Sequence, residues 1–149
     1  MIAVHYPEPQ FQLREEEGRT YLFDPLRKRW VVLTEEEWVR QNFIRYLVQE
    51  QGCPTAFIAL EKSIRLFDRN KRFDILVYDA AHRPWMLVEC KEPAVPLDDS
   101  VLQQVLNYGI SVPVPYLAIV NGRQCFGWNN AGGRLQPLAA LPRWPGFTV

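Results

Sequence analysis

Cysteine and histidine are scarce in this sequence, which has three cysteines and two histidines in 149 residues. The cysteines are odd in number, widely spaced and form no CxxC pair, so we expect reduced thiols rather than a disulfide framework. A Cys/His zinc site needs four ligands at regular spacing, and these five residues do not provide it. The sequence therefore excludes a small disulfide scaffold and a zinc finger.

Long apolar runs and an excess of charge are also missing. No stretch approaches the roughly 20 apolar residues of a membrane span, and the first residues lack the pattern of a secretory signal. We therefore expect a cytoplasmic protein with no membrane partner.

Basic and acidic residues balance at 17 each, so the formal net charge is zero. A neutral chain is not held to nucleic acid by bulk electrostatics, although phosphate contacts need only local positive charge.

The length and the ordinary apolar content predict one α/β domain over residues 1–149, built on a mixed β-sheet. Residues 1–33 are predicted to be an irregular arm followed by a hairpin. Residues 34–128 are the predicted core, and residues 129–149 the C-terminal tail. Within the core, helices are expected to begin near Thr34 and Asp98, and strands at 56–64, 73–78, 85–90, 116–120 and 125–128.

Two carboxylates and a lysine stand out in the central strands. Asp74 lies in one apolar strand, and Glu89 and Lys91 end the next one. Because strand side chains alternate, Glu89 and Lys91 share one face. A hairpin centred between residues 81 and 82 places Asp74 directly opposite Glu89. Like charges in that arrangement destabilise a sheet, and a divalent cation such as Mg²⁺ between them reverses the effect.

Other interpretations of these residues remain open. Asp74, Glu89 and Lys91 are also compatible with ordinary solvated surface charges, since isolated surface charges are common. A thiol enzyme based on Cys90 or Cys125 is a further hypothesis. The sequence favours it less, because only two histidines are available to act as the base.

The ordered set of Asp74, Glu89-x-Lys91 and Gln104-x-x-x-Tyr108 resembles the signature of the PD-(D/E)XK nuclease superfamily. More closely, the sequence resembles the N-terminal nuclease domain of type I restriction enzyme R subunits. The resemblance covers about residues 34–128, and its remaining matching stretches are Glu36–Gln41, Arg72–Asp79, Leu87–Pro93 and Tyr116–Gly122. Two features depart from it: the residue before Asp74 is not proline, and the phosphate loop of a helicase motor is absent.

The resemblance implies a restriction-endonuclease-like α/β/α core and hydrolysis of DNA phosphodiesters with Mg²⁺ or Mn²⁺. Asp74 and Glu89 then hold the metal ion, and Lys91 orients or activates the attacking water. Gln104 and Tyr108, which lie four residues apart on one helix face, line the site or touch DNA.

The resemblance also implies a glutamate from the first helix. By helical phase we favour Glu36 as a metal ligand, on the same face as Arg40. Glu37 instead fits the capping-box position three residues after Thr34. Arg40 either orients the glutamate or is an exposed helix residue. Glu61 is a further candidate, although strand glutamates are mostly surface residues.

Two basic groups are candidate DNA contacts or plain solvated faces, namely Lys62, Arg65, Arg69, Lys71 and Arg72, and the run Arg27–Arg29. The expected partners are DNA and the restriction-modification or helicase subunits of a larger complex. A homodimer is also expected, since cutting two strands takes two single-metal sites or two events. The alternative is a module that keeps the nuclease scaffold for DNA or partner binding without catalysis.

Overall fold

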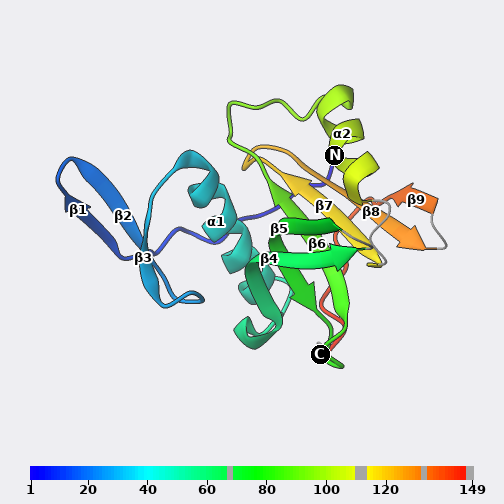
Figure 1. The fold of residues 1–149 in the computed structure, drawn as a ribbon, viewed down its shortest axis with the longest axis horizontal. Helices are drawn as coiled ribbons and strands as arrows, with labels where there is room; N and C mark the ends of the chain where they lie inside the picture. The colour runs from blue at the N-terminus through cyan, green and yellow to red at the C-terminus, as the bar shows by residue number, and fades with distance from the viewer. Residues whose placement is uncertain (67–68, 110–113, 132–133, 147–149) are drawn as a thin grey trace.

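A six-stranded mixed sheet with a helix against each face forms the centre of the structure (Figure 1), which is a computed structural model. It describes residues 1–66, 69–109, 114–131 and 134–146. The elements are β1 (Leu13–Glu16), β2 (Arg19–Asp24), β3 (Arg29–Val32), α1 (Glu35–Gln49), the 3-10 turn η1 (Thr55–Phe57), β4 (Ile58–Leu66), β5 (Arg69–Tyr78), β6 (Pro84–Cys90), α2 (Asp99–Gly109), β7 (Tyr116–Val120), β8 (Cys125–Ala131) and β9 (Arg134–Pro137).

The central sheet has the order β4-β5-β6-β7-β8-β9, and β6 and β7 are its parallel pair. A parallel pair needs a crossover, and helix α2 lies within the segment that connects these two strands. One face of the sheet packs on α1 through Phe43 and Leu47, and the other packs on α2 through Leu102 and Leu106. The expected α/β/α layering with a mixed sheet is thus confirmed.

Helix α1 begins where the sequence predicts. The hydroxyl oxygen of Thr34 accepts a hydrogen bond from the backbone N–H of Glu37 at 3.0 Å, which is the N-cap interaction. Phe43 and Leu47 are one turn apart and bury completely against the sheet. Gly52 follows the helix with a φ of +73°, a left-handed conformation that glycine adopts without strain.

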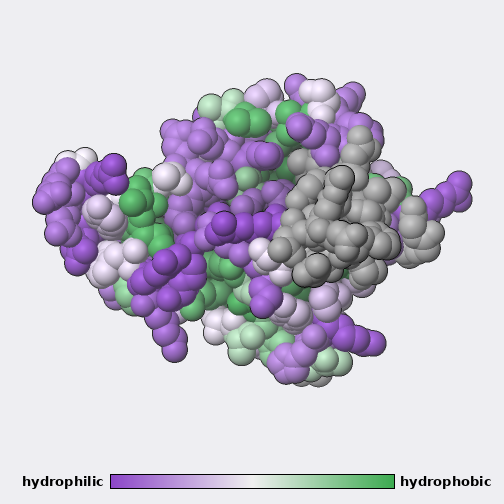
Figure 2. All heavy atoms as spheres, viewed as in Figure 1, coloured by the Kyte–Doolittle hydropathy of each residue, from purple (hydrophilic) through white to green (hydrophobic). Residues whose placement is uncertain are grey.

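The N-terminal sheet contains one strand more than the predicted hairpin. Its order is β1-β2-β3, and it lies on the side of α1 away from the central sheet (Figure 1). Figure 2 shows hydrophilic side chains at the end of this sheet that points away from α1. The sequence did not predict β1, because its four residues Leu13–Glu16 are all exposed and carry no apolar alternation.

The C-terminal segment contributes to the core, unlike the peripheral tail that the sequence suggests. Strand β8 continues to Ala131 and β9 pairs with it. Beyond β9, Leu141 and Trp144 are buried in the same cluster as Phe43 of α1. The indole N–H of Trp144 donates to the carbonyl oxygen of Tyr78 at 2.8 Å. The irregular backbone from Pro137 onward therefore carries core side chains, which its proline content conceals.

The hairpin of β5 and β6 has the register that the sequence predicts next to the site. Ile75 pairs with Val88, and the two following pairs keep the same register. The register then shifts between Val77 and Tyr78, near the turn in which His82 has a φ of 59°. The irregularity lies at the turn end, so the regular register extends to Ile75 and Val88, the residues next to Asp74 and Glu89.

The helices of the described residues were also assessed as membrane spans. None of them has the length and apolar content needed to cross a bilayer.

The core predicts a large loss of stability for Phe43→Ala, because Phe43 is fully buried between α1 and the sheet. Removing a buried phenylalanine costs about 3–5 kcal/mol in free energy of unfolding, measured by urea denaturation. Leu13→Ala is the control, since Leu13 is 53% exposed, and it should change that free energy by less than about 1 kcal/mol. Equal effects of the two substitutions would contradict this assignment of the core.

Candidate functional site

Asp74 and Glu89 lie together at one end of the β5–β6 hairpin. The regular pairing ends at Ile75 and Val88, so these two carboxylates occupy the next position along the strands. There the backbone N–H of Cys90 donates to Oδ2 of Asp74 at 2.7 Å. A backbone donor is thus bound by a side chain, which fixes the orientation of the Asp74 carboxylate.

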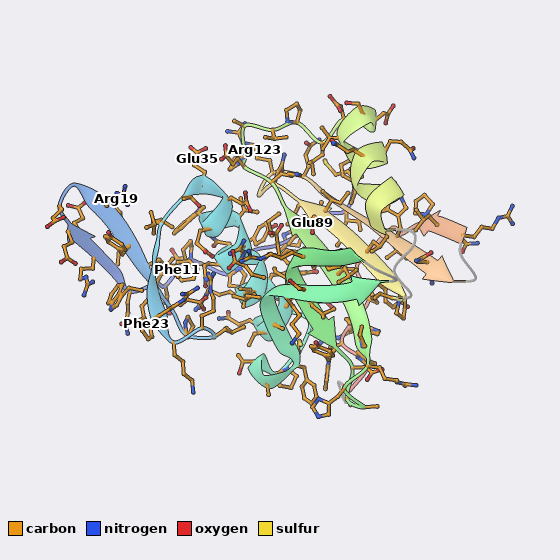
Figure 3. All side chains as sticks on the ribbon, viewed as in Figure 1. Phe11, Arg19, Phe23, Glu35, Glu89 and Arg123 are labelled. Atoms are coloured by element: carbon orange, nitrogen blue, oxygen red, sulfur yellow. The ribbon has the colours of Figure 1, made fainter. Side chains whose placement is uncertain are left out.

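Glu89 is a largely buried acid in the middle of the molecule (Figure 3). Its Oε1 atom is buried and has no hydrogen-bond partner among the described residues. Burial raises the pKa of Glu89 to about 8, with the charge of Asp74 and a hydrogen bond to Asp74 as further causes. An unpaired carboxylate oxygen in such a place costs free energy unless a proton or a cation satisfies it.

Lys91 directly follows this strand. Its backbone N–H donates to the carbonyl oxygen of Val120 at 2.8 Å, which anchors the residue to β7. Its side chain is partly exposed. The positive charge of the Lys91 ammonium group lowers the pKa of both Glu36 and Glu89, because it stabilises their ionised carboxylates.

The two candidate glutamates of α1 have different surroundings. Burial raises the pKa of Glu36, and the nearby charge of Asp74 raises it further. The side chain of Glu36 is 42% exposed. Glu37 is buried, and its carboxylate accepts from Arg27 at 2.6 Å, Arg40 at 3.1 Å and Gln41 at 3.2 Å. Glu36 therefore lies beside the Asp74 carboxylate, whereas the Glu37 carboxylate is occupied elsewhere.

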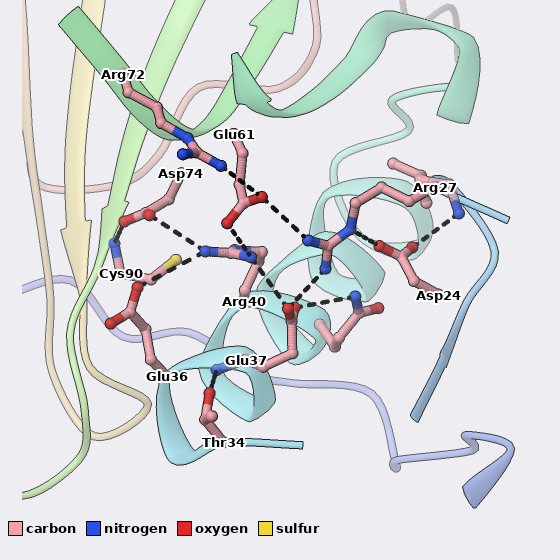
Figure 4. Close-up of polar contacts among 12 residues, drawn as sticks. Asp24, Arg27, Thr34, Glu36, Glu37, Arg40, Glu61, Arg72, Asp74 and Cys90 are labelled. Atoms are coloured by element: carbon pink, nitrogen blue, oxygen red, sulfur yellow. Dashed lines mark hydrogen bonds and ion pairs between the residues drawn. The ribbon is translucent and has the colours of Figure 1, made fainter. Parts of the chain in front are cut away.

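Arg40 occupies the centre of the acidic groups (Figure 4). It is 5% exposed, which corrects the suggestion that it is an exposed helix residue. Its Nη2 atom lies 3.3 Å from Oδ1 of Asp74 and 3.7 Å from Oε1 of Glu36. Its Nη1 atom lies 3.1 Å from Glu37 and 3.6 Å from Glu61. One guanidinium therefore links four carboxylates from three elements.

Arg27 extends this ion-pair network to the N-terminal sheet. Its guanidinium binds the carboxylates of Asp24 and Glu37, and lies 3.5 Å from Glu61. Burial lowers the pKa of Arg27, but hydrogen bonds to Asp24 and Glu37 raise it by more. The side chain is only 15% exposed, so the structure corrects the prediction that Arg27 contacts DNA. Lys28 and Arg29 are exposed.

Glu61 faces the same network from β4. It contacts Arg27, Arg40 and the exposed Arg72, the last at 2.8 Å. Its φ is +52°, a left-handed value that is uncommon for a residue other than glycine. The β4–β5 pairing omits Glu61 and Asp74 and resumes on both sides. The local distortion therefore lies at the two strand positions that carry site carboxylates.

The remaining predicted residues are less constrained. Gln104 and Tyr108 lie on α2, and the side chain of Gln104 is exposed. The side chains of Tyr108, Arg65, Arg69 and Lys71 lie outside the described residues, whereas Lys62 and Arg72 are exposed.

The donor set fits a hard divalent cation by chemical type. Asp74 and Glu89 provide adjacent carboxylate oxygens, and the buried Oε1 of Glu89 is without a partner among the described residues. Within the described parts of the chain, no group of three or more His, Cys, Asp or Glu side chains is arranged to hold a metal ion. Asp74 and Glu89 are therefore the two acids whose oxygens could hold a metal ion here, and Glu36 would be the nearest further acid on α1.

Sequence reasoning missed two contributors to the site. Arg27 was assigned to a basic run, and nothing in Arg27–Arg29 distinguishes a buried arginine from its exposed neighbours. The backbone N–H of Cys90 carries no sequence signal. A signal for Arg40 exists, since it follows Glu36 and Glu37 by four and three residues, the spacings that bring helix side chains together.

Comparison with known proteins identifies the family. A family model described as type I restriction enzyme R protein N terminus (HSDR_N) matches residues 35–142, well over half of the chain. The chain therefore belongs to this family. No curated protein matches it. A solved structure titled "cryoEM structure DrdV-DNA complex" is similar with 19% sequence identity and a TM-score of 0.48, over 69% of this chain and 10% of that chain.

The raised pKa of Glu89 predicts a pH dependence of stability in the presence of EDTA. Between the ordinary glutamate value of about 4.3 and the folded value of about 8, the folded chain binds more protons than the unfolded chain. Its free energy of unfolding therefore decreases as the pH rises through this window. Glu89→Gln cannot ionise, so at pH 9 it should be more stable than wild type by up to about 5 kcal/mol.

Urea denaturation at pH 4 and pH 9 measures this difference. Glu92→Gln is the matched control, because Glu92 is an exposed glutamate three residues away. The control should follow the wild-type pH profile. If Glu89→Gln loses as much stability between the two pH values as wild type does, the environment assigned to Glu89 is wrong.

Proposed function

We propose that this domain is a nuclease that hydrolyses DNA phosphodiester bonds with Mg²⁺ or Mn²⁺ held by Asp74 and Glu89. The observation that carries the proposal is the buried, unpartnered Oε1 of Glu89 beside the Asp74 carboxylate. Such a pair is unfavourable by itself and becomes favourable around a cation. Membership of the R protein family supports the same function.

The chain provides the means to hold a cation in place. The N–H of Cys90 binds one oxygen of Asp74, and the β5–β6 register holds Glu89 alongside. Glu36 contributes a third acidic group from α1, within electrostatic reach of Asp74. When bound, Mg²⁺ polarises a phosphoryl oxygen and lowers the pKa of a coordinated water.

Lys91 acts beside these ligands. Its backbone is fixed to β7, and its partly exposed side chain lies in electrostatic contact with Glu36 and Glu89. An ammonium group there orients the attacking water or donates to an oxygen of the phosphate on which negative charge develops. On α2, Gln104 is an exposed residue for DNA contact, and Tyr108 is proposed with it.

The β4–β5 hairpin is the proposed DNA-binding surface. Lys62 and Arg72 are exposed on it, and Arg65, Arg69 and Lys71 belong to the same two strands. The strands lead directly to Asp74, so a duplex that contacts this hairpin has a backbone close to the two carboxylates. Because the chain is neutral overall, its DNA binding should be weak and salt-sensitive.

One observation favours a second candidate function, a binding module without catalysis. Among the described residues no three metal-binding side chains converge, and Arg40 contacts the Asp74 carboxylate. In that case the nuclease scaffold serves to bind DNA or a partner subunit, and Asp74→Asn leaves this binding unchanged.

Variants of the two central residues distinguish the candidates. Asp74→Asn should abolish both Mn²⁺ binding in calorimetry and cleavage of plasmid DNA. Lys91→Ala should bind Mn²⁺ normally but cleave at least about 100-fold more slowly, since it removes acid–base or charge stabilisation alone. Arg19→Ala, an exposed cation on the N-terminal sheet, is the control and should cleave normally. Equal cleavage rates of Lys91→Ala and wild type would contradict the proposed catalytic role of Lys91.

Salt titration tests the DNA surface. Replacing Arg65, Arg69 and Lys71 by alanine should weaken DNA binding and reduce the slope of log K against log salt by up to about 3, because each phosphate contact contributes about 0.9. The control replaces Arg14, Arg19 and Arg134, which are exposed cations elsewhere, and should leave the slope unchanged. A similar loss in both variants would show that the hairpin has no special role.

A further inference from the structure

We infer that Arg40 is an internal counter-cation that neutralises Asp74 and that a divalent metal ion must displace. The inference rests on the proposed function, because it concerns the same carboxylates. It assigns to a helix residue the role of setting how tightly the site binds its metal.

The contacts of Asp74 lead to this inference. Oδ2 accepts from the N–H of Cys90 at 2.7 Å, and Oδ1 faces Nη2 of Arg40 at 3.3 Å. Each oxygen of the carboxylate therefore already has a cationic or N–H partner. A cation that binds Oδ1 has to compete with the guanidinium for that oxygen.

The charge distribution explains why Arg40 is in this position. Asp74 and Glu89 are adjacent acids, and the α1 glutamate Glu36 adds a third. Arg40 supplies positive charge while being 5% exposed, and its own Nε has no hydrogen-bond partner among the described residues. That N–H is a buried donor without a partner, so the present position of Arg40 costs free energy that a shift of the side chain toward a new partner can recover.

Arg40 can move away from Asp74 without leaving the buried carboxylate of Glu37 unpaired. The Glu37 carboxylate keeps Arg27 at 2.6 Å and Gln41 at 3.2 Å. Nη1 of Arg40 also keeps Glu37 and Glu61 as partners when Nη2 moves. The metal ion therefore has to displace Nη2 alone, from Asp74 at 3.3 Å and from the longer contact with Glu36 at 3.7 Å, rather than break the whole network.

Calorimetric titration of the full chain with Mn²⁺ tests the inference. Arg40→Gln removes the competing charge and keeps an amide for hydrogen bonding, so its dissociation constant should be at least about fivefold lower than that of wild type, since like charges at this distance repel. Arg40→Lys retains the charge and should stay closer to wild type. Arg83→Gln removes an exposed arginine charge that pairs with Asp79 near the turn of the β5–β6 hairpin, and is the matched control with an affinity near wild type.

A second measurement uses the wild-type chain and is independent of how the variants fold. The Nε–Hε signal of Arg40 in ¹⁵N-correlated NMR spectra, assigned by its loss in Arg40→Lys, should shift during a Mg²⁺ titration. Half of the shift should occur at the Mg²⁺ concentration that half-saturates the site. A signal that does not move, or an Arg40→Gln variant that folds but binds Mn²⁺ no more tightly, would overturn the inference.

Wild-type binding separates this failure from failure of the proposed function. If wild type binds Mn²⁺ and Asp74→Asn does not, the metal site stands whatever Arg40 does. If wild type binds no Mn²⁺ and Arg40→Gln binds none either, the proposed function itself fails, and the inference fails with it.

Discussion

The repulsion between Asp74 and Glu89 is the constraint on which the arrangement of this molecule depends. Two acids meet at the end of a buried hairpin, and the fold surrounds them with compensating groups. A backbone N–H binds Asp74, the guanidinium of Arg40 faces it, and Glu89 takes up a proton more readily. Without such compensation, two adjacent buried carboxylates would disfavour the register that brings them together.

Two arginines extend the charge compensation from this pair of acids to neighbouring carboxylates. Arg40 joins Asp74 to Glu37 and Glu61, and Arg27 joins those two acids to Asp24 on the N-terminal sheet. The sheet is therefore attached to the rest of the molecule partly by charges that originate at the candidate site. Buried ion pairs contribute little net stability but lose several kcal/mol when one partner is removed, so they specify geometry.

Periodicity and end signals predicted most of the fold. Thr34 and the apolar spacing of Phe43 and Leu47 predicted α1, and the predicted hairpin register holds for the pairs from Ile75 to Val77. The strands β1 and β9 could not be predicted in this way, because four-residue, largely exposed strands carry no apolar alternation. The α/β/α layering of the core was expected from the family resemblance rather than from residue patterns alone.

The residues of the candidate site could be proposed from the sequence, but the contacts among their side chains could not. Patterns in one dimension show that Arg40 can reach Glu36, but they cannot show that the same side chain reaches Asp74, 34 residues away in sequence. The contact exists because α1 carries its core residues and its charged residues within the same turns. A consequence is that α1 is held from two sides, by Phe43 in the core and by the ion pairs of Arg40 with Glu37 and Glu61, even when the Arg40 side chain exchanges one partner for another. Amide exchange in α1 should then require opening of the whole domain rather than local fraying.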